Sequence, residues 1–199
     1  MKTLGIVLCV MIISINSCKT ETNSYIKNPQ FAIWVENSSG EYILTEFITK
    51  FSANKNWNKD LPKERPEALP VWNHKIPNTI LKNEIDAVSS ATPNETFAIE
   101  INDSLTNGEE YNIYLEVNQS YDYNDTWTKS NSGVNGQPSI IYHTEFIVGQ
   151  NEIINLLPIG CGSVDGSNGD IDNNLDYFTT ANKIIEKVNP RLCRGTHTV

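Results

Sequence analysis

Phe31-Ala32-Ile33-Trp34-Val35-Glu36 is a stretch in which large apolar residues occupy every second position. A period of two places successive side chains on opposite faces of the chain, which predicts a β-strand. The turn residues Ser38-Ser39-Gly40 follow, and residues 42–51 alternate in the same way. Two alternating segments around a short turn predict an antiparallel hairpin.

The same period recurs toward the C-terminus. Residues 97–101 and 111–117 both alternate, and the Asn107-Gly108 pair between them is a turn signal, so we expect a second hairpin. Residues 140–148 are predicted to form a further strand, and residues 153–158 another.

Two regions depart from this period. Residues 52–84 hold four prolines, which exclude a long central strand or helix, so we expect an excursion held by the burial of Trp57, Leu69 and Trp72. Near the C-terminus, Thr179 or Thr180 is suited to cap a short helix that includes Ile184, Ile185 and Val188 and ends before Pro190. Short alternating strands and one short helix predict a mainly β fold, an antiparallel β-sandwich.

The N-terminal residues are typical of a secretory signal. Lys2 precedes an apolar run, residues 4–15, which is too short to span a bilayer stably. Ile15-Asn16-Ser17-Cys18 resembles a bacterial lipobox, which implies that residues 1–17 are removed and that Cys18 is lipidated. A plain transmembrane anchor or a buried helix is the alternative.

The lipobox predicts the location and domain organisation. Residues 18–28 are polar and are expected to form a lipidated, flexible tether, and residues 29–199 are long enough for a single domain with its own core. We therefore expect a protein of the cell envelope, periplasmic or surface-exposed, that is attached to the membrane through its N-terminal lipid.

The charge balance restricts the choice of partner. The chain has 15 Lys and Arg against 24 Asp and Glu, a net charge of −9. This excess of negative charge argues against nucleic acid and against an anionic lipid surface as the main partner.

Five segments together resemble a known family. They are 31–36, Arg65-Pro66-Glu67-Ala68-Leu69-Pro70-Val71-Trp72, 85–93, 114–124 and Gly136-Gln137-Pro138-Ser139. The chain is similar to the predicted periplasmic proteins catalogued as domain of unknown function 2271. The resemblance implies an Ig-like β-sandwich without an established activity, and an association with flavin-dependent membrane electron transfer.

One of these segments suggests a modification site. Asp86-Ala87-Val88-Ser89-Ser90-Ala91-Thr92 is similar to the sequence on which a periplasmic, metal-dependent transferase esterifies FMN to a threonine. The resemblance implies Thr92 as the FMN attachment site, Asp86 as part of the recognised segment, and a flavin transferase and a membrane redox protein as partners. The alternative is a structural turn, because Ser90 stands where glycine is commoner and Pro93 biases Thr92 toward extended backbone.

An acidic segment suggests a second site. Asp170, Asp172, Asn174 and Asp176 stand at alternate positions, which is the spacing of the first oxygen ligands in a calcium loop. The full EF-hand pattern is broken because Leu175 occupies the glycine position. A looser calcium site and a solvated surface loop both remain open.

The cysteines and the other carboxylates give weaker signals. Cys161 and Cys193 remain once Cys9 leaves with the signal and Cys18 is lipidated, and they are a candidate disulfide in an oxidising compartment. Glu116, Asp122 and Asp125 are candidates for a general acid and base, although carboxylates at the edge of a sheet are ordinary.

These observations favour a non-enzymatic function. The leading hypothesis is a lipid-anchored accessory or binding protein of the cell envelope, which in its sharper form carries FMN for extracytoplasmic electron transfer. The alternatives are an envelope hydrolase that uses calcium or carboxylates around residues 165–176, and a purely structural surface module.

Overall fold

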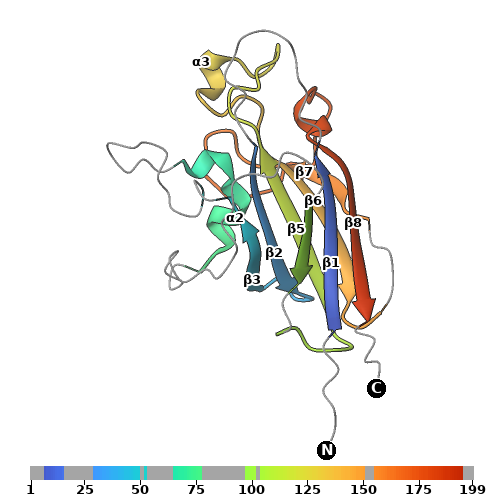
Figure 1. Cartoon of the computed structure of the whole chain (residues 1–199). Helices are drawn as coiled ribbons and strands as arrows, with labels where there is room; N and C mark the ends of the chain where they lie inside the picture. Colours follow the sequence, from blue (N-terminus) through green and yellow to red (C-terminus); the bar gives the residue numbers. More distant parts are fainter. Residues whose placement is uncertain are drawn as a thin grey trace, which may run out of the picture.

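The computed structural model describes residues 7–15, 29–49, 52, 65–77, 97–101, 104–150 and 155–194. The described protein is mainly β, and its largest element is a five-stranded antiparallel sheet of strand order β3-β2-β5-β6-β7 (Figure 1). These strands are β2 (Gln30–Asn37), β3 (Tyr42–Ile48), β5 (Glu110–Asn118), β6 (Ile140–Ile147) and β7 (Leu157–Cys161). The first predicted hairpin is confirmed, because β2 and β3 pair antiparallel around residues 38–41.

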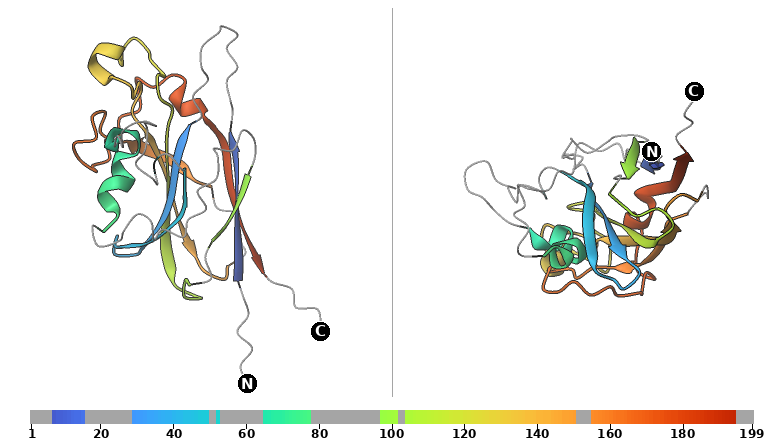
Figure 2. Two further views of the ribbon diagram at one scale, coloured as in Figure 1. Left: turned by 60° about the vertical axis from the view of Figure 1, so that its left-hand side comes forward. Right: turned by 90° about the horizontal axis from the view of Figure 1, so that it is seen from below.

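A second sheet has the strand order β4-β1-β8. Its strands are β1 (Val7–Ile15), β4 (Phe97–Ile101) and β8 (Ile185–Arg194), and β1 pairs antiparallel with both neighbours. Figure 2 shows this sheet on the side of the five-stranded sheet opposite the short helix α2 (Pro70–Lys75). Residues that we assign to a signal peptide thus form the central strand, and their cleavage stays a prediction.

The second predicted hairpin is wrong. β4 pairs with β1, whereas β5 lies between β2 and β6 in the other sheet. The connection therefore passes from one sheet to the other instead of turning back on itself. Gly108 has a φ of +88°, which suits glycine, and it donates its N–H to Val148 O at 2.9 Å, so the turn pairs with the end of β6.

The C-terminal helix is much shorter than predicted. It is a single 3-10 turn, Ala181–Lys183, after which the chain enters β8, where Val188 pairs with Ile13. Ile184 and Ile185 are buried in the main core, so the apolar residues that suggested a helix serve this core at the start of β8 instead. Pro190 is tolerated because β8 is an edge strand. The strand predicted at residues 153–158 is β7, displaced toward the C-terminus.

Both faces of the five-stranded sheet are covered. One face holds the main core, which includes Phe31, Ile33 and Val35 of β2. The other face holds a smaller cluster in which Ala32 and Trp34 pack with residues of α2 and its surroundings. Each face of β2 is therefore buried, and its residues 31–35 have no exposed surface.

Candidate functional site

Glu116 fastens the helix α2 to the sheet. Glu116 lies on β5, directly between Ala32 of β2 and Ile141 of β6, and it is fully buried. Its Oε2 accepts the backbone N–H of Trp72 at 2.8 Å, and its Oε1 accepts that of Val71 at 3.2 Å. These N–H groups lie in the first turn of α2, where no helical carbonyl is available to them, so the carboxyl group supplies the missing acceptors.

Further contacts complete the surroundings of Glu116. Ser139 Oγ donates to Glu116 Oε1 at 2.6 Å. A Cβ on Gly162 would lie 2.6 Å from Pro70 Cγ and 2.7 Å from Ser139 Oγ, so only glycine allows this close packing. Burial raises the pKa of Glu116 to about 7, although the three hydrogen bonds oppose this rise. Glu116 therefore titrates near neutral pH inside the protein.

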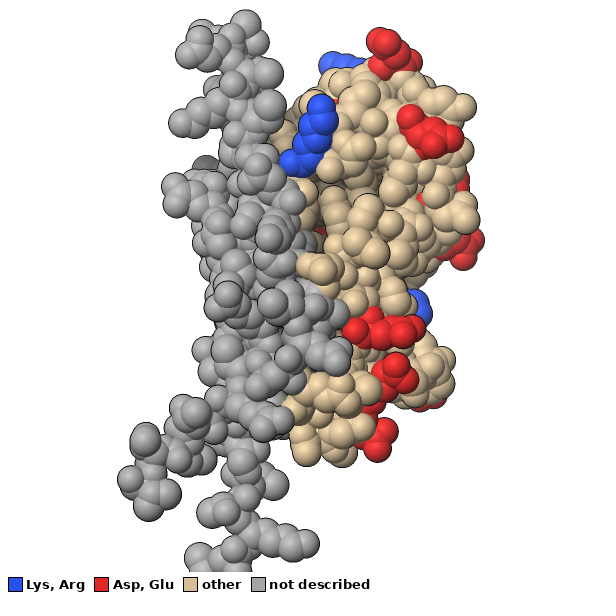
Figure 3. Space-filling view, turned by 90° about the vertical axis from the view of Figure 1, so that its right-hand side faces the viewer, with Lys and Arg blue, Asp and Glu red and all other residues tan. Residues whose placement is uncertain are grey.

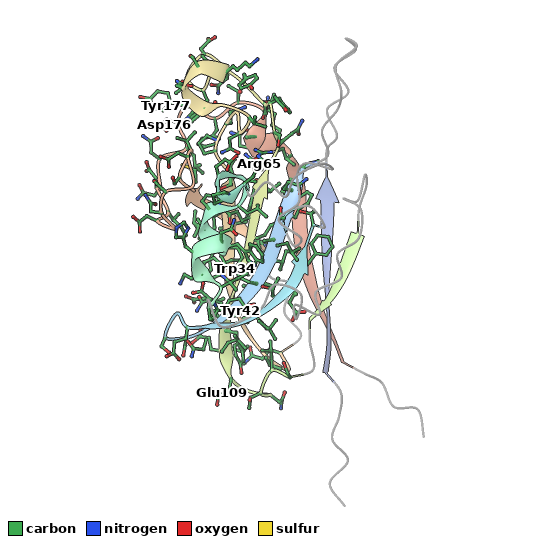
Figure 4. The ribbon with its side chains drawn as sticks, turned by 90° about the vertical axis from the view of Figure 1, so that its left-hand side faces the viewer. Trp34, Tyr42, Arg65, Glu109, Asp176 and Tyr177 are labelled. Atoms are coloured by element: carbon green, nitrogen blue, oxygen red, sulfur yellow. The ribbon has the colours of Figure 1, made fainter. Side chains whose placement is uncertain are left out.

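Further polar side chains on this face are also paired. Trp72 Nε1 donates to Thr45 Oγ1 at 3.0 Å, and Trp34 Nε1 donates to Glu36 Oε1 at 2.8 Å. Lys75 Nζ lies 3.0 Å from Glu36 Oε2 and closes the far end of α2. Figure 4 shows Trp34 and α2 on this side of the sheet. The burial predicted for Leu69 and Trp72 is confirmed, and Trp57 lies outside the described residues.

A second polar cluster forms around Gln137, which is fully buried. Its Nε2 donates to Asp122 Oδ2 and Thr180 Oγ1, both at 2.8 Å. Its Oε1 accepts the backbone N–H of Thr179 at 2.9 Å and Nδ2 of Asn124 at 3.1 Å. Thr180 also donates to Asp122 Oδ1. This cluster joins the segment after β5, the segment before β6 and the approach to β8.

Four of the five segments behind the family resemblance meet in these clusters. Segments 65–72, 114–124 and 136–139 are linked through Glu116, Gln137 and a hydrogen bond from Arg65 Nη1 to Ser120 Oγ at 2.8 Å. Segment 31–36 lies within β2, which pairs with β5 over its whole length. Segment 85–93, with Asp86 and Thr92, lies outside the described residues, as does Cys18.

A surface pocket of about 470 Å³ lies beside these clusters. Trp127 and Pro138 form part of its wall, and the loop after β7 forms the rest, including Asp170 and Asp172. Asp172 is fixed to β7, because its N–H donates to Cys161 O at 2.9 Å and its carbonyl accepts the Cys161 N–H at 2.7 Å. The pocket is thus built on the edge of the five-stranded sheet.

The four calcium candidates lie in this loop in two groups. Asp170 and Asp172 line the pocket, whereas Asn174 and Asp176 do not. Asp172 Oδ1 accepts the N–H of Asn174 at 2.9 Å, and Asn174 Oδ1 accepts that of Asp176 at 3.0 Å, so alternate side chains stabilise successive turns. Within the described ranges, no three or more His, Cys, Asp or Glu residues are grouped closely enough to hold a metal ion.

Cys161 carries a free, buried thiol, so the structure does not form the candidate disulfide with Cys193. The side chain of Cys193, in β8, lies outside what the structure describes. Burial, with the nearby charge of Asp172, raises the pKa of the Cys161 thiol to about 11. The thiol therefore stays protonated at neutral pH and is a poor nucleophile.

The proposed acid and base do not form a pair. Glu116 binds the first turn of α2, whereas Asp122 binds Gln137 and Thr180. Sequence reasoning also missed Gln137 and Trp127. The only signal for Gln137 was its place in a quoted segment, and a lone Trp127 in a polar stretch gives no signal for a pocket wall.

Comparison with known proteins gives no match to a family model, a curated protein or a solved structure. Among the described residues, no helix is long and apolar enough to cross a membrane.

Proposed function

We propose that the protein is a lipid-anchored accessory and binding module of the cell envelope, with an Ig-like β-sandwich fold, and that Thr92 carries FMN for electron transfer outside the cytosol. The proposal rests on the family resemblance and on the lipobox at Cys18. Periplasmic or surface attachment then comes from the lipid, because the net charge of −9 does not favour an anionic membrane surface.

One structural observation supports this proposal. The polar residues of the resembling segments that the structure describes are engaged in holding the fold: Glu116 fastens α2, and Gln137 joins three segments. A buried, hydrogen-bonded framework suits a rigid carrier, which must present its group to a partner without changing shape. The position of the three-stranded sheet on the side of the five-stranded sheet opposite α2 supports the sandwich separately.

The chemistry at Thr92 is supplied by another enzyme. Thr92 Oγ attacks the flavin-bearing phosphorus of a flavin dinucleotide, so that a phosphoester bond to FMN forms, the phosphoanhydride bond of the dinucleotide breaks with a nucleoside monophosphate as the leaving group, and the hydroxyl proton is lost. Small residues at Ser90 and Ala91 keep this segment slim, and Asp86 belongs to the stretch that the transferase recognises. A membrane redox protein is the expected electron partner.

The intact mass of the protein tests both parts of the proposal. The protein is purified from cells that contain the flavin transferase, beside Thr92→Val, which replaces the hydroxyl by a methyl group, and Ser90→Ala as a matched control. We expect a chain that begins at a lipidated Cys18 and carries the mass of one FMN minus one water. The flavin mass should vanish in Thr92→Val and persist in Ser90→Ala.

Two other results would overturn the proposal. A mature chain that still contains residues 1–17 would contradict lipidation at Cys18. A mass without added flavin in all three proteins would contradict the attachment of FMN to Thr92. The alternative of a calcium-dependent or carboxylate-based envelope hydrolase is favoured by one observation, the position of Asp170 and Asp172 in a pocket. A hydrolytic activity that is lost in Asp170→Asn would support it.

A further inference from the structure

The pocket beside Trp127 combines apolar walls with uncompensated negative charge. Its apolar walls include Trp127, Pro138, Val164 and Ile171, and its charged residues are Asp170 and Asp172. None of its ten lining residues is Lys, Arg or His. The lining therefore holds two carboxyl groups and no basic side chain next to an aromatic ring.

The aromatic wall is held in place before any ligand arrives. The ring of Trp127 packs against Phe178 with 4.6 Å between ring centroids, and its backbone N–H donates to Asn124 Oδ1 at 2.8 Å. An indole ring that is fixed in this way can offer its face or edge to a cation or an apolar group without a further loss of freedom.

The carboxylates are also presented from fixed backbone. The N–H of Asp170 donates to Asn168 Oδ1 at 3.0 Å, and Asp172 is paired with Cys161 through both backbone groups. The N–H of Asn174 occupies Oδ1 of Asp172, which leaves its second oxygen for a ligand. The lining residue Ser163 is also held in place, because its Oγ donates to Asp165 Oδ1 at 2.6 Å.

We propose that this pocket binds a small organic cation, an ammonium or guanidinium group on a slim apolar stem. The charged head pairs with Asp170 and Asp172, and the stem lies against Trp127 and Ile171. The volume of about 470 Å³ lies within the range of small-molecule sites.

Other ligand classes fit the pocket less well. The two carboxylates repel an anion, so the phosphate of FMN is not its ligand, and the site is independent of Thr92. Calcium takes six to eight oxygen ligands, whereas the pocket is lined by only two carboxylates, Asp170 and Asp172, and one of their four oxygens is already engaged.

Titration calorimetry with a pair of probes tests this proposal. Benzylamine is positively charged at neutral pH, and benzyl alcohol has a similar shape without the charge. We expect benzylamine to bind the purified protein about tenfold more tightly than benzyl alcohol, and its affinity to fall with added salt. Asp170→Asn and Trp127→Leu should each weaken benzylamine binding about three- to tenfold.

Matched variants separate this site from general effects of charge and from the flavin. Asp176→Asn makes the same charge change in the same loop but outside the pocket, so it should bind benzylamine as the unmodified sequence does, and so should Thr92→Val. Equal affinity for the two probes, or equal weakening in Asp176→Asn, would overturn the proposal. Calcium binding that is lost in Asp170→Asn without any binding of benzylamine would also overturn it and assign the pocket to the metal.

Discussion

At the scale of single residues, Glu116 gives the protein a pH dependence that its position in the sequence does not suggest. Burial raises the pKa of Glu116 from its ordinary value of 4.5 to about 7 in the folded state. The folded protein therefore binds this proton more tightly than the unfolded chain. The resulting stabilisation is fully present below pH 4.5 and is lost as the pH rises through about 7, a change of roughly 3 kcal/mol in the free energy of unfolding.

Replacing Glu116 by Gln should abolish this pH dependence. An amide imitates the protonated acid, because its nitrogen can donate to Ser139 Oγ while its oxygen accepts the N–H of Trp72. Urea unfolding between pH 5 and 8 measures the effect, and the curve of Glu116→Gln should be flatter than that of the unmodified protein. Burial also raises the pKa of Asp122, which adds a smaller dependence of the same sign to both proteins. Parallel curves would contradict the assignment.

At the scale of elements, the contact between the segments before β6 and after β5 depends on Gly136. Its φ is +75°, and a Cβ there would lie 2.6 Å from the backbone N of Asp122. We expect Gly136→Ala to lower the free energy of unfolding by about 2–4 kcal/mol. Gly108→Ala is the matched control, since Gly108 also has a positive φ but open space around it, and it should lose only about 1 kcal/mol.

Chemical denaturation of the two variants measures this difference. Equal losses would show that the backbone angle, and not the close approach of the chains, determines the effect. If Gly136→Ala lowers the free energy of unfolding, it should also weaken the hydrogen bonds around Gln137. This weakening would be seen as faster hydrogen exchange at the N–H of Thr179.

Alternation in the sequence predicts where strands lie but not which strands pair. The period of two at residues 31–36, 111–117 and 140–148 identifies β2, β5 and β6, because each strand has at least one buried face. The partner of β4 depends instead on β1, which is 80 residues or more away in sequence and was interpreted by its composition alone. Local turn chemistry at Asn107-Gly108 was therefore a poor guide to the pairing.

The candidate site was less predictable than the fold. Glu116 has the spacing of an outward polar residue on β5, and only the packing of α2 over that face shows that it is buried. Asp170 and Asp172 were singled out by their spacing, but their role in a pocket depends on the backbone pairing of Asp172 with Cys161. Such contacts between distant segments leave no local pattern in the sequence.

At the scale of the whole molecule, the surface charge of the domain affects how it can be held at a membrane. Acidic side chains prevail over basic ones on the face drawn in Figure 3, in keeping with the net charge of −9. A lipid at Cys18, as proposed, would then have to hold the domain at a membrane that its surface does not attract.

Removal of residues 1–17 should loosen the three-stranded sheet selectively. β4 and β8 are both antiparallel to β1, so without β1 they are parallel and lose their common partner. Hydrogen exchange should therefore be faster at residues 97–101 and 185–194 in a chain that starts at Cys18, while β2, β5 and β6 keep their protection. A chain that lacks only residues 1–5 is the control, and equal exchange at β4 in both would contradict this expectation.

The central place of β1 also sets an order of events. If residues 1–17 are a signal peptide, as proposed, the export machinery must bind them while the chain is still unfolded. The nine residues of β1 are no longer accessible to that machinery once both edges of the strand are hydrogen-bonded to β4 and β8. A chain that folds before export would therefore bury the segment that the export machinery must bind. A chain that is exported and cleaved in time would fold without β1, and β4 and β8 would then lack their shared hydrogen-bonding partner.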